Sequence, residues 1–408
     1  MSNIRMTGSF QWMKTLNKST ILNTIRLHSP ISRAEIAKKT KLTPPTVTNI
    51  VAELIEANLV RESEIGVSKG GRKPILLTIN DQDSFIVGVD VGGHLIRTIV
   101  TDINAKILTK FEIALPMELT IETFIEKLIQ AIDAAINKSK APKDKILGIG
   151  VGMHGIVDYE KGVSIFAPNF QLTNIPIKSC LEKHFQITTF VENDVRAFAL
   201  GETWYGNGQG TEHLICINIG VGIGAGIILN SELFHGNNGI AGEFGHMIVD
   251  INGEKCSCGS YGCLQTVAGG SALRERALKE IKGGRQSLIY DRAQGQIERI
   301  DGAFIFNCAK SGDELALEIL AETGTYIGIG VLNLINVINP ARIIVGGGVA
   351  KAGEFVLEPL RKIVKQRALT SGARETEIIH SKLGDDATVI GAVTLVLKDL
   401  FSPRVNGE

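Results

Sequence analysis

The feature that most constrains this chain is an alternation of short apolar runs and longer helical stretches from about residue 85 onward. The strand-like runs fall at 85–91, 146–151, 188–191, 214–219 and 343–345, and the helical stretches at 121–136, 315–338 and 355–369. Alternation of this kind predicts α/β layers. Two of the runs lead into glycine-rich turns, at 90–93 and 220–226, and this pairing predicts two similar lobes that enclose a cleft.

Length and composition bound the class of protein. The chain has 408 residues, which favours two or three domains, and its 44% hydrophobic and 21% charged residues exclude a disordered chain. No apolar run approaches the roughly 18 residues of a membrane span, and the first residues lack the apolar centre of a signal peptide. We therefore expect a cytoplasmic protein without a membrane partner.

Charge is distributed unevenly along the chain. The net charge is zero, yet residues 1–80 hold 12 Lys and Arg against 5 Glu and no Asp, while the remainder holds 31 against 38. A basic end on a neutral protein is typical of nucleic-acid binding.

Three short helices are predicted within this basic end. The first covers 20–28 and stops before Ser29-Pro30. The second covers about 32–39, because Ser32 and Glu35 form a capping box. The third follows Thr43, a residue type that caps helices, and begins with two prolines, which are favoured in the first turn. This order predicts a helix-turn-helix.

The third helix carries its apolar residues on one stripe, at 47, 50, 51, 54 and 55. Small polar side chains on its other face suit contact with base edges in the major groove. Strands at 59–64 and 75–79, joined by a basic glycine-rich turn, predict a wing. The predicted DNA contacts are Ser32, Arg33, Thr43, Pro45, Thr46, Thr48, Asn49, Lys69, Arg72 and Lys73. The alternative to a helix-turn-helix is a three-helix unit that does not bind DNA. The alternative for the basic residues of the turn is that they are only exposed to solvent.

The six cysteines divide into two groups by spacing. Cys256, Cys258 and Cys263 follow His246 within 18 residues, with glycines between them that let the chain fold around an ion. This set predicts a tetrahedral Cys3His zinc site, and the alternative is a group of unrelated buried thiols. Cys180, Cys216 and Cys308 stand alone among apolar neighbours and are expected in the core.

The run 239–246, Gly-Ile-Ala-Gly-Glu-Phe-Gly-His, followed by the cysteine motif 256–263, resembles the signature of the ROK family of repressors, open reading frames and sugar kinases. The turn at 90–93, the triplet 192–194 and the glycines at 346–348 extend the resemblance over about 85–400. Residues 32–37 and 70–74 resemble the DNA-binding half of the family's repressor branch. The resemblance implies an α/β fold: a winged helix-turn-helix plus a two-lobed, actin-like sugar-kinase-like (ribonuclease H-like) ATPase-type domain.

The resemblance also implies a sugar site and a metal site. By their match to family positions, the residues expected to contact sugar are Asn169, Asn193, Asp194, Glu243, His246 and Gln265, and the expected zinc ligands are His246, Cys256, Cys258 and Cys263. Carboxylates and amides supply the paired donors and acceptors that neighbouring hydroxyls require.

Three positions depart from the family's kinases. His94 and Val221 stand in the two glycine-rich turns where the kinases generally carry Thr or another small polar residue, and Gln265 replaces a Glu. A phosphate-binding turn of this type needs a hydroxyl, so we expect no enzyme activity and no ATP requirement. Asp194, at the position of the kinase base, is retained.

Together with the basic N-terminal end, the resemblance implies a repressor of carbohydrate-utilisation genes. Its domains are expected at 1–80 and 81–408, the second with lobes at about 81–195 plus the C-terminal helix and at about 196–390, and a zinc loop at 246–263. A homodimer, or a dimer of dimers, is expected to bind an inverted repeat in operator DNA and to respond to a small sugar such as xylose. The alternatives are an ATP-dependent sugar kinase with an accessory domain, and a constitutive DNA-binding protein whose kinase-like half only dimerises.

Overall fold

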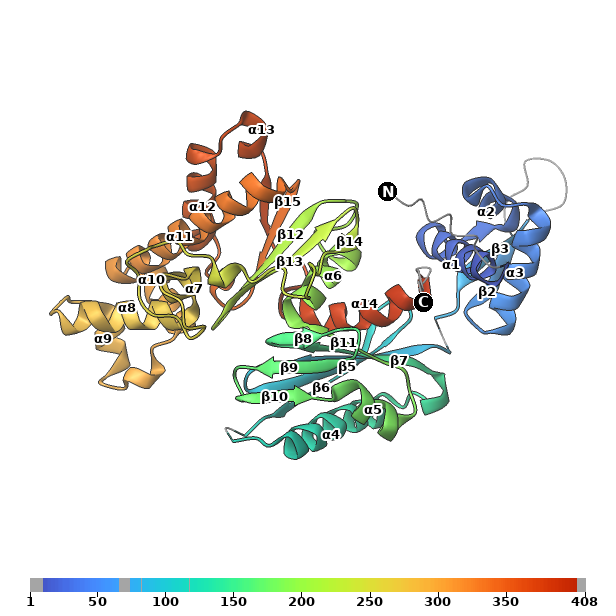
Figure 1. Ribbon diagram of the computed structural model, residues 1–408, viewed down its shortest axis with the longest axis horizontal. Helices are drawn as coiled ribbons and strands as arrows, with labels where there is room; N and C mark the ends of the chain where they lie inside the picture. The colour runs from blue at the N-terminus through green and yellow to red at the C-terminus, as the bar shows by residue number, and fades with distance from the viewer. Residues whose placement is uncertain (1–9, 66–73, 82, 117, 402–408) are drawn as a thin grey trace.

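The computed structural model describes residues 10–65, 74–81, 83–116 and 118–401 of the chain. A small N-terminal unit lies beside a larger unit built from two lobes (Figure 1). The last strand of the small unit, β3, ends at Ile79, and the first strand of the larger unit, β4, begins at Phe85. The predicted fold class, a winged helix-turn-helix joined to a two-lobed α/β domain, is confirmed.

The N-terminal unit consists of three helices and a small sheet. The helices are α1 (Phe10–His28), α2 (Arg33–Thr40) and α3 (Pro44–Glu56); the strands are β1 (Ile31–Ser32), β2 (Val60–Ile65) and β3 (Ile75–Ile79), in the order β1-β3-β2. The predicted capping box of Ser32 and Glu35 is present, and the Thr43 side chain accepts a hydrogen bond from the Thr46 N–H. Helix α1 starts ten residues before residue 20, where the predicted helix begins. The prediction rests on apolar spacing, and the sequence before residue 20 does not show that spacing.

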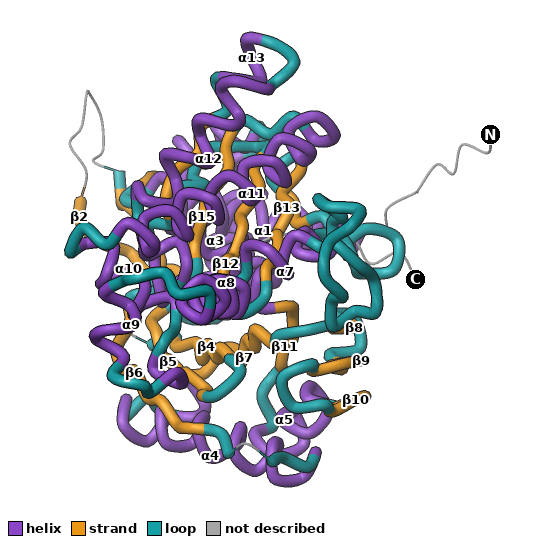
Figure 2. Tube along the Cα trace, turned by 90° about the vertical axis from the view of Figure 1, so that its left-hand side faces the viewer, coloured by secondary structure: helices purple, strands orange, loops and turns teal. Residues whose placement is uncertain are grey.

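The first lobe is a five-stranded sheet in the order β11-β7-β4-β5-β6. Its strands are β4 (Phe85–Val91), β5 (Leu95–Asp102), β6 (Ile107–Ala114), β7 (Ile146–Met153) and β11 (Thr189–Asn193). Helices α4 (Ile121–Ser139) and α5 (Ile177–Phe185) cover the outer side of this sheet in both views (Figures 1 and 2). A small sheet of β8 (Ile156–Asp158), β9 (Val163–Ala167) and β10 (Leu172–Ile175) lies beside it.

The second lobe repeats this topology. Its strands are β12 (Leu214–Ile219), β13 (Ile223–Leu229), β14 (Glu232–Leu233), β15 (Arg342–Gly346) and β16 (Glu377–His380), in the order β14-β13-β12-β15-β16. In each lobe the first three strands are antiparallel and the fourth and fifth run parallel to the first. The identical strand order supports the duplication predicted from the paired glycine-rich turns.

Helices of unequal length complete the second lobe. They are α7 (Leu264–Ala268), α8 (Gly270–Lys282), α9 (Leu288–Ala293), α10 (Gly302–Lys310), α11 (Glu314–Ile338), α12 (Glu354–Arg367) and α13 (Ser371–Arg374). Short 3-10 helices are η1 (Lys143–Lys145), η2 (Phe244–His246), η3 (Ile297–Arg299), η4 (Val349–Ala352) and η5 (Gly384–Asp386). Among the described helices, α11 alone has the length and apolar composition of a membrane span, and it packs against α12 and α10 within this lobe.

Two helices form the junction between the lobes. Helix α14 (Ala387–Phe401) returns from the C-terminal end of the chain and packs on β7 and β4, whereas α6 (Asp194–Tyr205) packs on β13 and β12. The two helices cross at Gly391, where an added Cβ would lie 1.7 Å from the Ala197 carbonyl oxygen. A side chain at that crossing would force the helices apart, so glycine is required there.

One apolar cluster extends from the N-terminal unit into this junction. Ile21 and Ile25 of α1 belong to the same buried cluster as Val393 and Leu397 of α14. Burial of side chains on both sides makes the N-terminal unit part of a shared core rather than a freely tethered module.

Candidate functional site

A cleft of about 360 Å³ lies between the lobes. It is lined from the first lobe by the turn after β4 and the ends of β7 and β11, and from the second lobe by the turn between β12 and β13. Loops at the carboxyl ends of strands are the usual binding position in α/β folds. Of the residues predicted to contact sugar, Asn169, Asn193, Asp194, Glu243 and Gln265 line this cleft.

Asn193 and Asp194 begin helix α6 at the floor of the cleft. The Asn193 Oδ1 accepts from the Val195 and Arg196 N–H groups at 3.0 and 3.1 Å, and its Nδ2 donates to the Gly155 carbonyl and to Asp194 Oδ1, both at 3.0 Å. An amide makes at most four such bonds, so Asn193 is fully used within the protein. Its observed role is to cap α6 and to orient Asp194, whose pKa is raised by burial.

Asn169 also lines the cleft, beside the first glycine-rich turn. An added Cβ on Gly93 would lie 2.7 Å from the Asn169 Nδ2, so the glycine of the first turn leaves the space that this amide occupies. The Asn169 side chain is exposed to the cleft. It is therefore available to a ligand.

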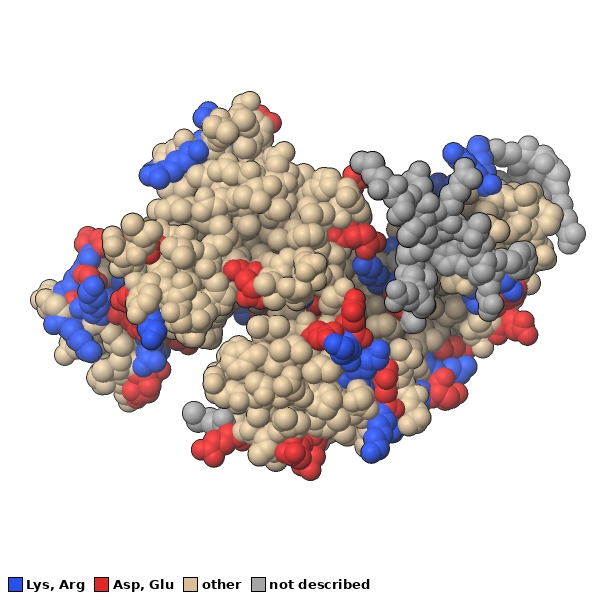
Figure 3. Space-filling view, viewed as in Figure 1, with Lys and Arg blue, Asp and Glu red and all other residues tan. Residues whose placement is uncertain are grey.

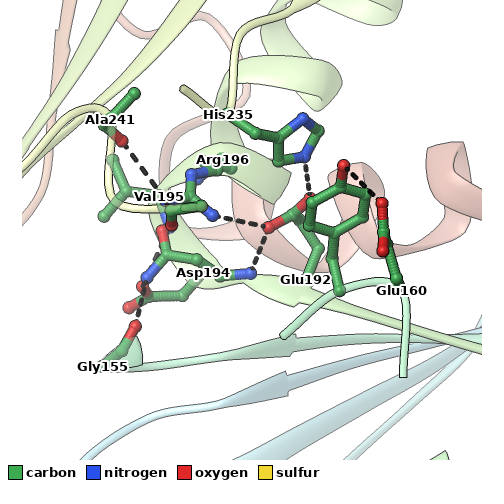
Figure 4. A network of polar contacts seen from close by, with 11 residues as sticks. Gly155, Glu160, Glu192, Asp194, Val195, Arg196, His235 and Ala241 are labelled. Carbon is green, nitrogen blue, oxygen red and sulfur yellow. Dashed lines mark hydrogen bonds and ion pairs between the residues drawn. The ribbon is translucent and has the colours of Figure 1, made fainter. Parts of the chain in front are cut away.

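The loop that carries Glu243 is held against the second sheet by close backbone contacts. Gly242 has φ +96° and an added Cβ there would lie 1.9 Å from the Ala225 carbonyl oxygen. Helix α6 holds the same loop, because the Arg196 guanidinium donates to the carbonyl oxygens of Gly239 and Ala241, the latter at 3.3 Å (Figure 4). These contacts fix the position from which Glu243 faces the cleft.

Arg196 belongs to a buried charge network that sequence reasoning missed. Glu192 Oε1 lies 3.2 Å from the Arg196 Nη1 and accepts from the Asn193 N–H at 2.7 Å, and Glu192 Oε2 lies 2.6 Å from the His235 Nε2 (Figure 4). The side chains of Glu192 and Arg196 are only 3% and 4% exposed. A charged Glu directly before the Asn-Asp pair was the available signal, but its partners come from a helix and a distant loop.

The four predicted metal ligands converge on one point. The ligand atoms of His246, Cys256, Cys258 and Cys263 all lie within 4.8 Å of one another. The Cys258 and Cys263 sulfurs are 3.7 Å apart, and the Cys256 sulfur is 3.7 Å from the His246 Nδ1. Thiolates about 2.3 Å from a tetrahedral ion are separated by about this distance, so the donor set and its geometry fit zinc.

Two of the predicted sugar residues serve this cluster. The Gln265 Nε2 donates to the Cys256 sulfur at 3.2 Å, although the side chain also borders the cleft. The His246 Nε2 lies 3.9 Å from Glu243 Oε2, and among the described residues His246 is not one that lines the cleft. This separation is longer than a hydrogen bond, but it places the Glu243 carboxylate between the cluster and the cleft.

The two glycine-rich turns border the cleft with exposed side chains. His94 is exposed in the first turn and Val221 in the second, and neither turn has a hydroxyl side chain. Asp90, the next-to-last residue of β4, has its Oδ2 3.4 Å from the Arg97 Nη1. Burial and the charge of Asp194 raise the Asp90 pKa to about 7, although Arg97 opposes the shift.

Helix α3 lies on the outer side of the N-terminal unit, away from the lobes (Figure 1). Its stripe of Val47, Ile50, Val51 and Leu54 is buried, as predicted. The outward face presents the predicted residues Thr43, Pro45, Thr48 and Asn49 to solvent, with Thr46 half-buried. The structure thus gathers five of the predicted DNA contacts on one exposed helix end.

The other predicted contacts are placed differently. Ser32 is buried and its hydroxyl is bonded to Glu35, while Arg33 is paired with Glu62 at 2.9 Å. Lys69, Arg72 and Lys73 lie outside the described residues. Figure 3 shows basic side chains at the upper edge of the N-terminal unit, whereas the middle of the second lobe presents few charges on that face.

Comparison with known proteins gives two family matches. Residues 86–399 match the ROK family, and residues 16–61 match a winged helix-turn-helix DNA-binding family. The chain is 34% identical to the xylose repressor of Caldicellulosiruptor bescii over 397 residues, covering 97% of this chain and 98% of that protein.

Two solved structures show how the resemblance divides. A ROK family transcriptional regulator, described as a homologue of the Escherichia coli MLC protein, matches 96% of this chain and 98% of its own at 27% identity and a TM-score of 0.86. A ROK family glucokinase from Streptomyces griseus, solved with glucose and AMPPNP, matches 76% of this chain and 99% of its own at 33% identity and a TM-score of 0.68. The regulator therefore matches a larger share of this chain than the kinase does.

Proposed function

This chain belongs to the ROK family and to its DNA-binding, sugar-responsive repressor branch, and we propose that a small sugar bound between its lobes releases its winged helix from operator DNA. Asn169, Asp194 and Glu243 are the sugar contacts, and Asn193 and Gln265 position their neighbours. The cleft volume of about 360 Å³ suits a monosaccharide.

The observation that carries this function is the course of helix α6. It begins with Asp194 in the cleft and ends with Trp204 and Tyr205 beside α1 of the N-terminal unit. A rigid helix that contacts both regions transmits a displacement from one to the other. A coupling free energy of about 1–3 kcal/mol changes operator occupancy 5- to 150-fold.

The contact at the far end of α6 involves a cation and two aromatic rings. The Arg26 guanidinium lies 4.2 Å from the ring centroid of Trp204 on α6 and 5.3 Å from that of Phe401 on α14. Burial lowers the pKa of Arg26 and raises the pKa of the neighbouring Tyr205 to about 12. Arg26 thus joins the winged helix to both helices of the lobe junction.

Sugar binding without phosphoryl transfer is part of the proposal. The turns at 90–93 and 220–226 lack the hydroxyl that would ligate phosphate, and Arg97 pairs with the carboxylate of the first turn. A coupled assay with ATP and D-xylose, D-glucose or N-acetylglucosamine is expected to show no turnover above background. Robust turnover that Asp194→Asn abolishes would favour the rival, a sugar kinase with an accessory domain.

The exposed end of α3 is proposed as the base-reading surface. Asn49→Ala is expected to weaken operator binding by about 1–3 kcal/mol and to relax the preference at one base pair, because an exposed amide there can bond a base edge. The measurement is fluorescence anisotropy with operator variants at fixed salt. Asn137→Ala, an exposed asparagine on α4 in the first lobe, is the control. Equal affinity of both variants for every operator sequence would exclude α3.

The Cys3His cluster is proposed to hold one structural zinc ion. Cys258→Ser is expected to lower the zinc content measured by elemental mass spectrometry and to weaken sugar binding, since the ion holds the loop that bears Glu243. Operator affinity in the absence of sugar should change little. Cys180→Ser, outside the cluster, should keep its zinc. Full sugar affinity in metal-free protein would contradict this role.

The remaining details of the proposal concern assembly and context. We propose a cytoplasmic homodimer that places two winged helices on an inverted repeat, with half-sites separated by about 34 Å or a multiple of it. Xylose is the first sugar to test, because a relative that aligns with 97% of this chain at 34% identity is a xylose repressor. Mass photometry and footprinting test the dimer and the spacing.

A further inference from the structure

His154 lines the cleft from the carboxyl end of β7. It directly follows β7, the strand between β4 and β11, and the last residue of β7, Met153, is in register with Val91 and with Asn193. His154 therefore lies between the first glycine-rich turn and the start of α6, and it lines the cleft.

The ring of His154 is held in one orientation. Its Nδ1 lies 3.2 Å from the Val91 carbonyl oxygen, and its edge packs on Phe170 with ring centroids 4.6 Å apart at 82°. The next residue, Gly155, has φ +85°, and an added Cβ there would lie 2.2 Å from the Phe166 carbonyl oxygen. The chain after His154 is thus fixed by a turn that requires glycine.

These contacts determine which ring nitrogen carries the proton. A carbonyl oxygen only accepts, so Nδ1 is the donor, and Nε2 of the neutral ring is an acceptor. Burial lowers the pKa of His154, although the charge of Asp194 opposes this, and burial thus favours the neutral ring.

The Nε2 acceptor lacks a hydrogen-bond partner within the described part of the chain. The residue is 7% exposed, and a buried acceptor without a partner is unfavourable. The neighbouring carboxylate of Asp194 is also an acceptor, and its bonds come from the Asn193 amide and the Val195 N–H. The His154 Nε2 and the Asp194 carboxylate are therefore both acceptors at this part of the cleft.

We propose that the Nε2 of His154 accepts a hydrogen bond from one hydroxyl of the bound sugar, adjacent to the hydroxyl that Asp194 contacts. The inference rests on the proposed function and adds a specificity-determining residue to its site. Neighbouring hydroxyls donate one hydrogen each, which matches two adjacent acceptors. A sugar without that hydroxyl leaves Nε2 unpaired and binds more weakly.

A matched pair of substitutions tests the two nitrogens separately. In His154→Asn the amide retains a donor for the Val91 carbonyl but has no atom at the Nε2 position, whereas His154→Gln extends an acceptor toward that position. The sugar is whichever of D-xylose, D-glucose and N-acetylglucosamine binds the unaltered protein most tightly by titration calorimetry, together with its monodeoxy analogues. Thermal melting confirms that both variants fold.

We expect His154→Asn to bind the sugar at least about tenfold more weakly and His154→Gln to recover part of that loss. One monodeoxy analogue should bind the unaltered protein more weakly than the parent sugar does. The His154→Asn variant should bind this analogue and the parent sugar with equal affinity. Operator affinity without sugar should be the same in all three proteins. Sugar binding that is unchanged in His154→Asn would overturn this inference and leave the proposed function standing, whereas no binding of any of the three sugars to the unaltered protein would overturn both.

Discussion

Arg196→Met is expected to lower the free energy of unfolding by about 3–5 kcal/mol, because it leaves the Glu192 carboxylate buried without its cationic partner. The substitution also removes the donors to the Gly239 and Ala241 carbonyls. For a domain that spans residues 86–399, with an unfolding entropy of about 2.1 cal/mol/K per residue, a loss of this magnitude corresponds to a fall in melting temperature of about 4–8 °C. Urea denaturation and calorimetry measure the two quantities.

A double substitution separates the buried charge from simple loss of side-chain volume. Adding Glu192→Gln to Arg196→Met removes the unpaired charge and should restore part of the lost stability. The control is Arg285→Met, which breaks the exposed pair of Arg285 with Glu318 and should change stability by less than about 1 kcal/mol. Equal stability losses in the Arg196 and Arg285 variants would contradict the network's importance.

Arg26→Ala is expected to uncouple sugar binding from DNA binding. The guanidinium bridges Trp204 of α6 and Phe401 of α14, and a partly buried cation–π contact contributes about 1 kcal/mol. Its loss should reduce the ratio of operator affinities without and with saturating sugar by about fivefold. Sugar affinity in the absence of DNA should change by less than about fivefold, and so should operator affinity in the absence of sugar.

The ratio, rather than either affinity, is the informative quantity. Arg299→Ala, which replaces an exposed arginine of the second lobe, provides the matched control and should retain the full ratio. A ratio in Arg26→Ala equal to that of the unaltered protein would show that α6 communicates with the winged helix by another contact.

The sequence predicts those helix and strand ends that depend on residues close to them in the chain. The strands 85–91 and 214–219 and the starts of α2 and α3 were predicted at their observed positions, because apolar runs and capping side chains act over one or two turns. The cysteine spacing likewise predicted the four residues that the structure brings together. Strands β5 and β6 were not predicted, since their polar and apolar residues follow a less clear pattern.

The polar network of the cleft could not be predicted in the same way. Glu192 and His235 are 43 residues apart and meet only after the signature loop folds against α6. The orphaned nitrogen of His154 depends on which strand lies beside β7, because the Val91 carbonyl fixes the ring. Likewise, the sequence predicts that the Asn193 amide contacts the sugar. In the structure this amide caps the start of α6, and all its hydrogen bonds are made within the protein. Such roles follow from topology rather than from neighbouring residues.

The most direct test measures operator binding by fluorescence anisotropy while sugar is added in the absence of ATP. We expect D-xylose, D-glucose or N-acetylglucosamine to weaken operator binding 5- to 150-fold and to be recovered unmodified. Operator binding that is unaffected by every sugar, together with brisk ATP-dependent phosphorylation of one of them, would contradict the account.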